Sequence, residues 1–99
     1  MKKVVKAQIT WIAHENGGRK NPPVPGTRYC PIVVFDAMDK NKNEFWSAYF
    51  ICTEVDARMN SIVDFTFLVD DAPISYLVKG NKFELFEGNK KVAFGIIIE

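Results

Sequence analysis

The sequence predicts an all-β domain, built as a small barrel or sandwich of six short strands. Aromatic residues make up 13% of the 99 residues, and aromatic side chains favour strands. Several segments of strand length are either apolar throughout or alternate between apolar and polar residues. Clusters of glycine, proline and asparagine separate these segments, and none of them has the periodicity of a long helix. Closure into a barrel would also remove the exposed edges of such apolar strands.

The first two strands are predicted on either side of a long loop. In residues 4–12 the apolar and polar side chains alternate, which is typical of a half-buried strand with Val5, Ala7, Ile9 and Trp11 on its inner face. Residues 30–37 are apolar and β-branched, and they predict a well-buried second strand. Pro31 should lie at the start of this strand or on a sheet edge, because proline cannot donate a hydrogen bond to a strand ladder.

Four more strands follow a polar turn at residues 38–44. The third, residues 45–53, is apolar on both faces, and residues 53–60 could hold at most one helical turn. The fourth, residues 61–69, should turn an apolar stripe inward, made of Val63, Phe65, Phe67 and Val69. Gly80–Asn81 and Gly88–Asn89 each suit a two-residue hairpin loop, so they should bracket a fifth strand at 82–87 and begin a sixth at 91–98.

Composition sets limits on the protein class. Residues 1–99 should form one domain, and a net charge of +1 means that any binding of nucleic acid must depend on a local patch. We expect a cytoplasmic protein with no membrane contact, because neither a signal peptide nor a long apolar span is visible. Cys30 and Cys52 both lie in apolar runs and are predicted to be buried free thiols, with a bridge between neighbouring strands as the alternative.

Motifs for catalysis or metal binding are weak in this sequence. His14 is the only histidine, and no cysteine near it has the spacing of a zinc site or the surroundings of an activated thiolate. The turn at 38–44 begins like a calcium loop, but Glu44 stands where glycine is needed and Phe50 where the last carboxylate ligand is needed. We therefore expect no enzyme activity, no catalytic residue, no metal site and no cofactor.

One loop, residues 14–29, combines flexible backbone with positive charge. Gly17 and Gly18 allow positive φ angles, and their amides could form an anion-binding concavity. Positive side chains beside them suit phosphate, which makes the candidate binding residues Gly17, Gly18, Arg19, Lys20 and Arg28. The alternative is that the glycines and prolines only route a long connection between strands.

At this loop the chain resembles the third domain of elongation factor Tu. In that family a glycine-glycine-arginine triplet precedes a proline and a glycine-aromatic-arginine-proline run, matched here by Gly17, Gly18, Arg19, Pro22 or Pro23, Gly26 and Arg28. The C-terminal segment resembles the last hairpin of the same domain, through Phe83, Leu85, Glu87, Gly88, Val92 and Gly95. Thr27 stands where the family has the aromatic residue, and the proline after the arginine is displaced to Pro31.

The resemblance implies a closed six-stranded antiparallel barrel with Greek-key-like connections. It does not imply GTP hydrolysis, because residues 1–99 hold no phosphate-binding loop of the GTPase type. In the full-length factor this barrel touches tRNA and protein partners. By resemblance we expect a non-catalytic module that engages tRNA, another RNA or a translation-related protein through residues 13–29, with Arg19, Lys20 and Arg28 near phosphates.

A second hypothesis is a protein-interaction domain without a nucleic-acid role. The third strand has more apolar side chains than the interior of a small barrel needs. Some of them are therefore expected on the surface as anchors for a partner protein or for a homo-oligomer, with Trp46, Tyr49 and Phe50 as the candidates.

Overall fold

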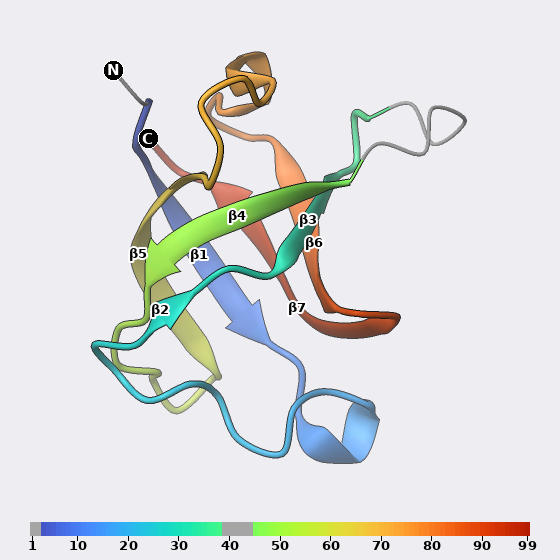
Figure 1. Ribbon diagram of the computed structural model, residues 1–99. Coiled ribbons are helices and arrows are strands. Elements are labelled where there is room, and N and C mark those ends of the chain that lie inside the picture. The colour runs from blue at the N-terminus through green and yellow to red at the C-terminus, as the bar shows by residue number, and fades with distance from the viewer. Residues whose placement is uncertain (1–2, 39–44) are drawn as a thin grey trace.

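The computed structural model describes residues 3–38 and 45–99, and in these ranges the chain forms a closed six-stranded antiparallel barrel plus one extra short strand (Figure 1). The strands are β1 (Val5–Trp11), β2 (Arg28–Tyr29), β3 (Ile32–Phe35), β4 (Trp46–Ile51), β5 (Asn60–Phe67), β6 (Lys82–Glu87) and β7 (Lys90–Ile97). The single-turn 3-10 helices η1 (His14–Asn16) and η3 (Ile74–Tyr76) join them, and no helix in the described ranges could cross a membrane. The predicted all-β class and barrel are confirmed. The polar turn and the calcium-loop comparison at 39–44 fall outside the described residues.

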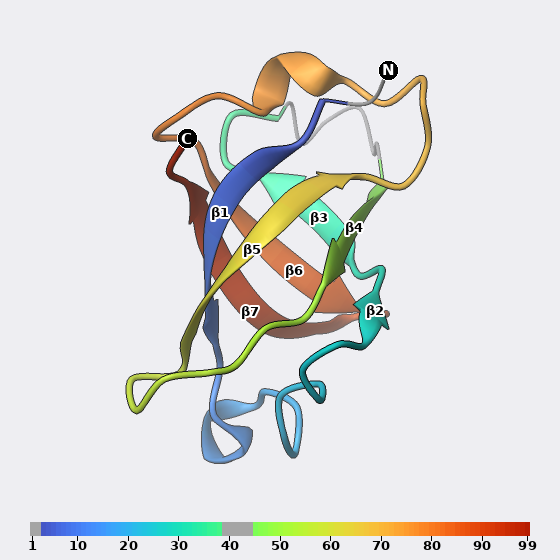
Figure 2. The same ribbon diagram turned by 90° about the vertical axis from the view of Figure 1, so that its left-hand side faces the viewer.

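The order of strands around the barrel is β1–β5–β4–β3–β6–β7, and β7 pairs again with β1. Strands β3, β4 and β5 follow one another as neighbours, and β6 then returns to the free side of β3. This is the Greek-key arrangement of four strands. Figure 2 shows β1, β5 and β4 side by side, with β6 and β7 behind them.

Aromatic rings from four strands fill the barrel interior. Phe65 of β5 lies 4.8 Å from Phe83 of β6 and 5.9 Å from Phe50 of β4, measured between ring centroids. Phe35 of β3 lies 5.3 Å from Phe83. All four rings are almost completely buried, as are the apolar side chains of β1 on the predicted inner face. These contacts join opposite sides of the barrel, which makes the ring cluster the centre of the core.

The predicted second strand, residues 30–37, is shorter in the structure, at Ile32–Phe35, and the short strand β2 precedes it across Pro31. The step from Tyr29 to Ile32 is three positions, and the step between their partners on β4, from Phe50 back to Ser47, is also three. β2 and β3 therefore continue one strand in one register. Pro31 accepts a hydrogen bond from the Ala48 amide at 2.8 Å but has no N–H to return one, so the ladder is interrupted there. Pro31 does precede β3, as expected. Arg28 and Tyr29, which were predicted to belong to the loop, form strand β2 before it.

Of the two predicted glycine-asparagine hairpins, only one forms. Gly88–Asn89 connects β6 to β7, and the flanking residues Glu87 and Lys90 are paired, so this prediction is confirmed. The prediction for Gly80–Asn81 was wrong, because β6 pairs with β3 and β7 rather than with β5, the strand that precedes it. The Asn81 amide instead donates to the Val78 carbonyl at 3.1 Å and closes a turn before β6.

Two apolar side chains lie outside the core, contrary to expectation. Both cysteines are free thiols, but only Cys52 is buried, while Cys30 is exposed. Cys30 lies between half-buried Tyr29 and buried Pro31 in an extended segment, where alternation directs its side chain outward. Val69 is 43% exposed, because β5 ends at Phe67 and the chain has left the barrel wall.

Candidate functional site

The long loop between β1 and β2 lies at one end of the barrel, opposite the end that carries residues 68–81 (Figures 1 and 2). It begins with the turn η1, in which the Gly17 amide donates to the His14 carbonyl and the Gly18 amide to the Ala13 carbonyl, both at 3.0 Å. Gly17 has a φ of 93°, so the expected positive φ is present. The expected anion-binding concavity is absent at these two amides, because their N–H groups already donate to carbonyls within the turn.

Gly18 is a glycine for a different reason. A Cβ atom built on Gly18 would lie 1.8 Å from the carbonyl oxygen of Ile12, far inside the contact distance. The backbone of the turn can press against the end of β1 only where no side chain exists. This close approach sets the direction in which the chain leaves the turn, toward Arg19.

Arg19 is fixed to the barrel rather than extended into solvent. Its Nη1 donates to the Glu87 carboxylate at the end of β6, and its Nε donates to the Asn21 carbonyl at 3.0 Å. The guanidinium also lies over the ring of Tyr29, 5.5 Å from the ring centroid. A planar group with several donors is suited to hold these three partners at once. Arg19 therefore joins the loop to β2 and β6.

Tyr29 and Glu87 complete this cluster. The Tyr29 hydroxyl donates to the Glu87 oxygen that also receives Arg19. The Tyr29 ring lies 5.6 Å from the rings of Trp11 and Phe50. Burial and the adjacent carboxylate raise the pKa of Tyr29, so the phenol stays protonated and acts as the donor. Burial alone would raise the pKa of Glu87, but the hydrogen bonds from Tyr29 and Arg19 outweigh it and hold the pKa below 4.5.

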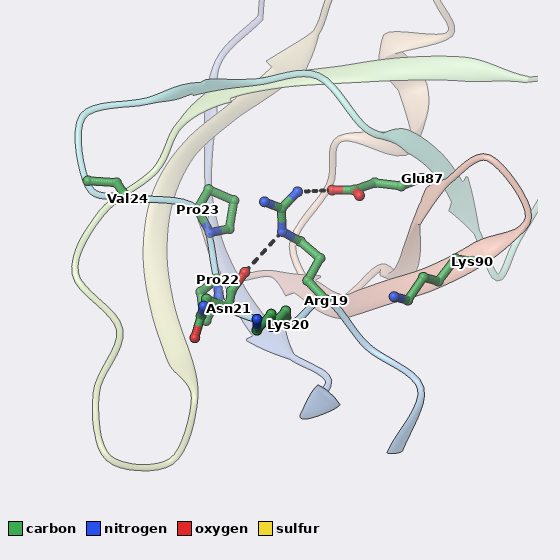
Figure 3. A pocket seen from close by; sticks show the side chains of 8 residues that line it. All are labelled: Arg19, Lys20, Asn21, Pro22, Pro23, Val24, Glu87 and Lys90. Carbon is green, nitrogen blue, oxygen red and sulfur yellow. Dashed lines mark hydrogen bonds and ion pairs between the residues drawn. The ribbon is translucent and has the colours of Figure 1, made fainter. Parts of the chain in front are cut away.

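A hollow of about 450 Å³ opens beside this cluster (Figure 3). One wall is the Pro22–Pro23 segment, and Glu87 and Lys90 border it from the β6–β7 turn. Arg19 points across it toward Glu87, and Lys20 and Lys90 are exposed at its rim. The lining thus contains three cationic side chains and one carboxylate, which is already engaged by Arg19. We call this hollow the basic groove.

The structure brings together only part of the predicted binding set. Arg19 and Lys20 both line the basic groove, whereas Arg28 does not and is exposed on β2, opposite Ile51 of β4. Lys90 was missed. It follows the Gly88–Asn89 turn, which the sequence does predict, but no local pattern indicates that this turn reaches a loop about seventy positions earlier in the chain.

The predicted protein-interface residues separate in the same way. The expectation of an exposed Phe50 was wrong, because Ala48 and Phe50 face inward on β4 and are completely buried. Trp46 is partly buried against the core, with its ring 6.5 Å from that of Phe67. Tyr49 is partly buried and lines a hollow on the outer face of the barrel.

The side chains considered for catalysis or metal binding differ in their exposure. His14 is exposed on η1, while Cys52 is buried in the core. Burial raises the pKa of the Cys52 thiol, although the charge of Arg19 opposes this, so the thiolate form is disfavoured. Across residues 3–38 and 45–99 no three histidine, cysteine or acidic side chains gather closely enough to hold a metal ion.

Two comparisons with known proteins, with family models and with curated sequences, found no relative of this chain. No protein-family model matches the chain, and no curated protein is significantly similar to it. The resemblance to the third domain of elongation factor Tu therefore remains a prediction from the residues quoted above. Two of them, Arg19 and Glu87, are in direct contact in the structure.

The contacts of Glu87 predict a pH-dependent contribution to stability. Glu87→Gln should lower the free energy of unfolding at pH 7 by about 1 kcal/mol, a modest value because the Arg19 and Glu87 side chains are 34% and 36% exposed. The pKa of Glu87 is lower in the folded protein, so its contribution is complete above the ordinary value of 4.5 and is lost as the pH falls through the folded pKa. Urea unfolding of both proteins at a series of pH values measures this.

Glu84→Gln is the matched control on the same strand. Glu84 pairs with Lys91 at 2.5 Å on the barrel surface, and no other side chain in residues 3–38 and 45–99 donates to it, so the substitution should cost less at pH 7. A difference between wild type and Glu87→Gln that persists unchanged at low pH would contradict the assigned role of the carboxylate.

Proposed function

We propose that the protein is a non-catalytic binding module that holds the phosphate backbone of RNA, with tRNA as the first candidate, in the basic groove. The observation that carries this proposal is the convergence of Arg19, Lys20 and Lys90 on one open hollow. Its single lining carboxylate, Glu87, is occupied by Arg19 and Tyr29. Phosphate backbones bind to proteins mainly through such clusters of lysine and arginine.

The three cations have different roles in this proposal. Arg19 is held by Glu87, Asn21 and Tyr29, so it positions the loop, and its charge balances that of Glu87. Lys20 and Lys90 are exposed at the rim and can reach phosphate oxygens directly. Arg28 lies outside the groove and is not required.

The groove is rigid, which favours binding. The affinity for RNA should nevertheless be modest. Proline side chains form one wall, and beyond them the Gly26 amide donates to the Cys52 carbonyl at 2.8 Å, so the loop is tied to the barrel before and after the prolines. A fixed loop loses little conformational freedom on binding. Because the net charge of the chain is only +1, the attraction is local and should weaken steeply with salt.

Filter binding with tRNA across a salt series tests the proposal. Wild type should bind at low salt, and the double variant Lys20→Ala/Lys90→Ala should bind more weakly. The slope of log K against log salt should become shallower by about 1 to 2. The control is Lys79→Ala/Lys82→Ala, which removes the same charge from exposed lysines outside the groove.

The control variant separates a specific groove from general charge. It should keep the wild-type slope, because its lysines do not line the groove. The absence of salt-dependent binding by wild type would overturn the proposal, and so would equal losses in the two double variants.

A further inference from the structure

A second groove lies on the outer face of β1, β5 and β4, and it shares no residue with the basic groove. Three exposed apolar side chains border it: Val4 is 56% exposed, Ile51 42% and Ile62 47%. They surround a hollow of about 340 Å³ on the face that Figure 2 shows in front. Apolar side chains gathered around a hollow are the usual mark of a contact surface.

An acidic hollow lies next to this apolar one. A neighbouring hollow of about 430 Å³ shares Thr53 and Ile62 with it and adds the carboxylates of Glu54 and Asp56. Lys6 and Asp64, 2.5 Å apart, form an ion pair within the apolar part. The two adjacent hollows, which we together call the seam groove, are therefore lined by three carboxylates and one lysine. Glu54 and Asp56 lie at one end, and neither forms an ion pair within residues 3–38 and 45–99.

The seam groove follows the junction between β4 and β5. In the described residues the β4–β5 ladder consists of Ala48–Phe67 and Tyr49–Thr66, whereas the β1–β5 ladder has six pairs. Beyond Tyr49, β4 pairs with β2 on its other side, and the Thr53 hydroxyl donates to the Ile62 carbonyl at 2.9 Å. The lining residues on β5 run from Asn60 to Thr66, so the two hollows follow one another along this strand, an arrangement that suits an extended chain.

We propose that the seam groove binds an extended segment of a partner protein in which apolar side chains are followed by lysine or arginine. The apolar part would receive the apolar side chains, and Glu54 and Asp56 would attract the basic one. Asp56 is fixed for this role, because its Oδ1 accepts the amides of Arg58 and Asn60 at 2.8 and 3.0 Å.

Other occupants fit the groove less well. RNA would be repelled by the acidic end. A second copy related by a two-fold axis through the groove would set one groove against the other and leave both hollows unfilled. A peptide is the occupant that matches shape, apolar character and charge together.

Peptide selection on the intact protein tests this inference. A phage library of short random linear peptides is selected on wild type, and the most enriched peptide is synthesised with a fluorescent label. Enriched sequences should combine apolar residues with lysine or arginine. By fluorescence polarisation, Ile62→Glu should weaken the binding of that peptide by about tenfold or more. Glu54→Lys should weaken it as well, through charge repulsion.

The matched control is Phe94→Glu. Phe94 is an apolar residue on the outer face of β7 with nearly the same exposure, 49% against 47% for Ile62, and it does not line the groove. This variant should bind the peptide like wild type. Circular dichroism should show that all three variants keep the folded spectrum.

Three outcomes would overturn the inference: no enrichment of peptides, enriched peptides that lack basic residues, or equal binding by wild type and Ile62→Glu. Self-association in analytical ultracentrifugation that is lost in Ile62→Glu and kept in Phe94→Glu would instead identify a second copy as the occupant. The seam groove and the basic groove share no lining residue, so Ile62→Glu should leave tRNA binding unchanged. The inference is therefore independent of the RNA proposal.

Discussion

Replacing Phe65 with alanine is expected to lower the free energy of unfolding by about 4 kcal/mol. Phe65 is completely buried, and its ring lies within 4.8 to 6.4 Å of the rings of Phe83, Phe50 and Phe35. The substitution removes apolar contacts on three sides and leaves a cavity between strands that cannot move together, because the barrel is closed. A loss of this size is a large part of the roughly 5 to 15 kcal/mol that stabilises a typical domain.

Urea unfolding followed by circular dichroism measures this loss. Phe94→Ala provides the comparison, because it deletes the same ring from a strand at a site that is 49% exposed, and it should cost about 0.5 kcal/mol or less. Similar costs for the two substitutions would show that the ring cluster does not form the centre of the core. Phe65→Leu should fall between them, since it refills part of the cavity.

The elements that the sequence predicts best are those with one buried face. β1 alternates between apolar and polar residues, and this pattern alone gives its inner side chains correctly. β6 begins and ends where expected, at Lys82 and Glu87, because a glycine-asparagine pair flanks it on each side. Local signals suffice in these cases, because the strand's own residues and those directly beside it determine its bounds and its buried face.

Errors arise where a neighbouring strand decides the outcome. Gly80–Asn81 has the composition of a hairpin loop, but the Greek key places β6 beside β3, so no hairpin can form there. Arg28 and Tyr29 were predicted to lie in the loop, but β4 pairs with them as β2 and keeps one register on both sides of Pro31. A single sequence does not indicate which strands become partners, and both errors follow from that.

The third strand shows an error that local reasoning could have avoided. It has apolar residues on both faces, so Trp46, Tyr49 and Phe50 were all candidates for the surface. Alternation allows only every second one to face outward. Phe50 shares the inner face with Ala48, which leaves Tyr49 and Ile51 on the outer one.

The candidate site depends on contacts between distant parts of the chain. Glu87 is 68 positions from Arg19 and 58 positions from Tyr29, yet one of its oxygens receives both. The sequence does indicate the loop as unusual, through its glycines, prolines and positive charge. It does not indicate that Arg19 is bound to the barrel, which changes the role of this residue from ligand contact to positioning.

Gly18→Ala is expected to cost about 3 kcal/mol, the upper part of the usual range for overpacking. The new Cβ would lie 1.8 Å from the Ile12 carbonyl oxygen, and this neighbour is backbone at the end of β1, which cannot rotate away. Gly17→Ala should cost only about 1 kcal/mol, because a Cβ at Gly17 meets no atom within 4 Å and only the positive φ of 93° is unfavourable. Comparing the two variants therefore separates the cost of a steric clash, at Gly18, from the cost of an unfavourable φ angle, at Gly17.

Urea unfolding at a series of pH values gives both the stabilities of the two variants and the pH dependence of those stabilities. Relief of the clash at Gly18 requires the turn to move away from β1, and Arg19 is the next residue in the chain. The hydrogen bond from Arg19 to Glu87 should then be strained or lost, so Gly18→Ala should also reduce the pH dependence of stability below pH 4.5. Gly17→Ala should keep that dependence, because its turn can remain in place. If both alanine variants lose stability equally and keep the same pH profile, the close approach at Gly18 does not position Arg19.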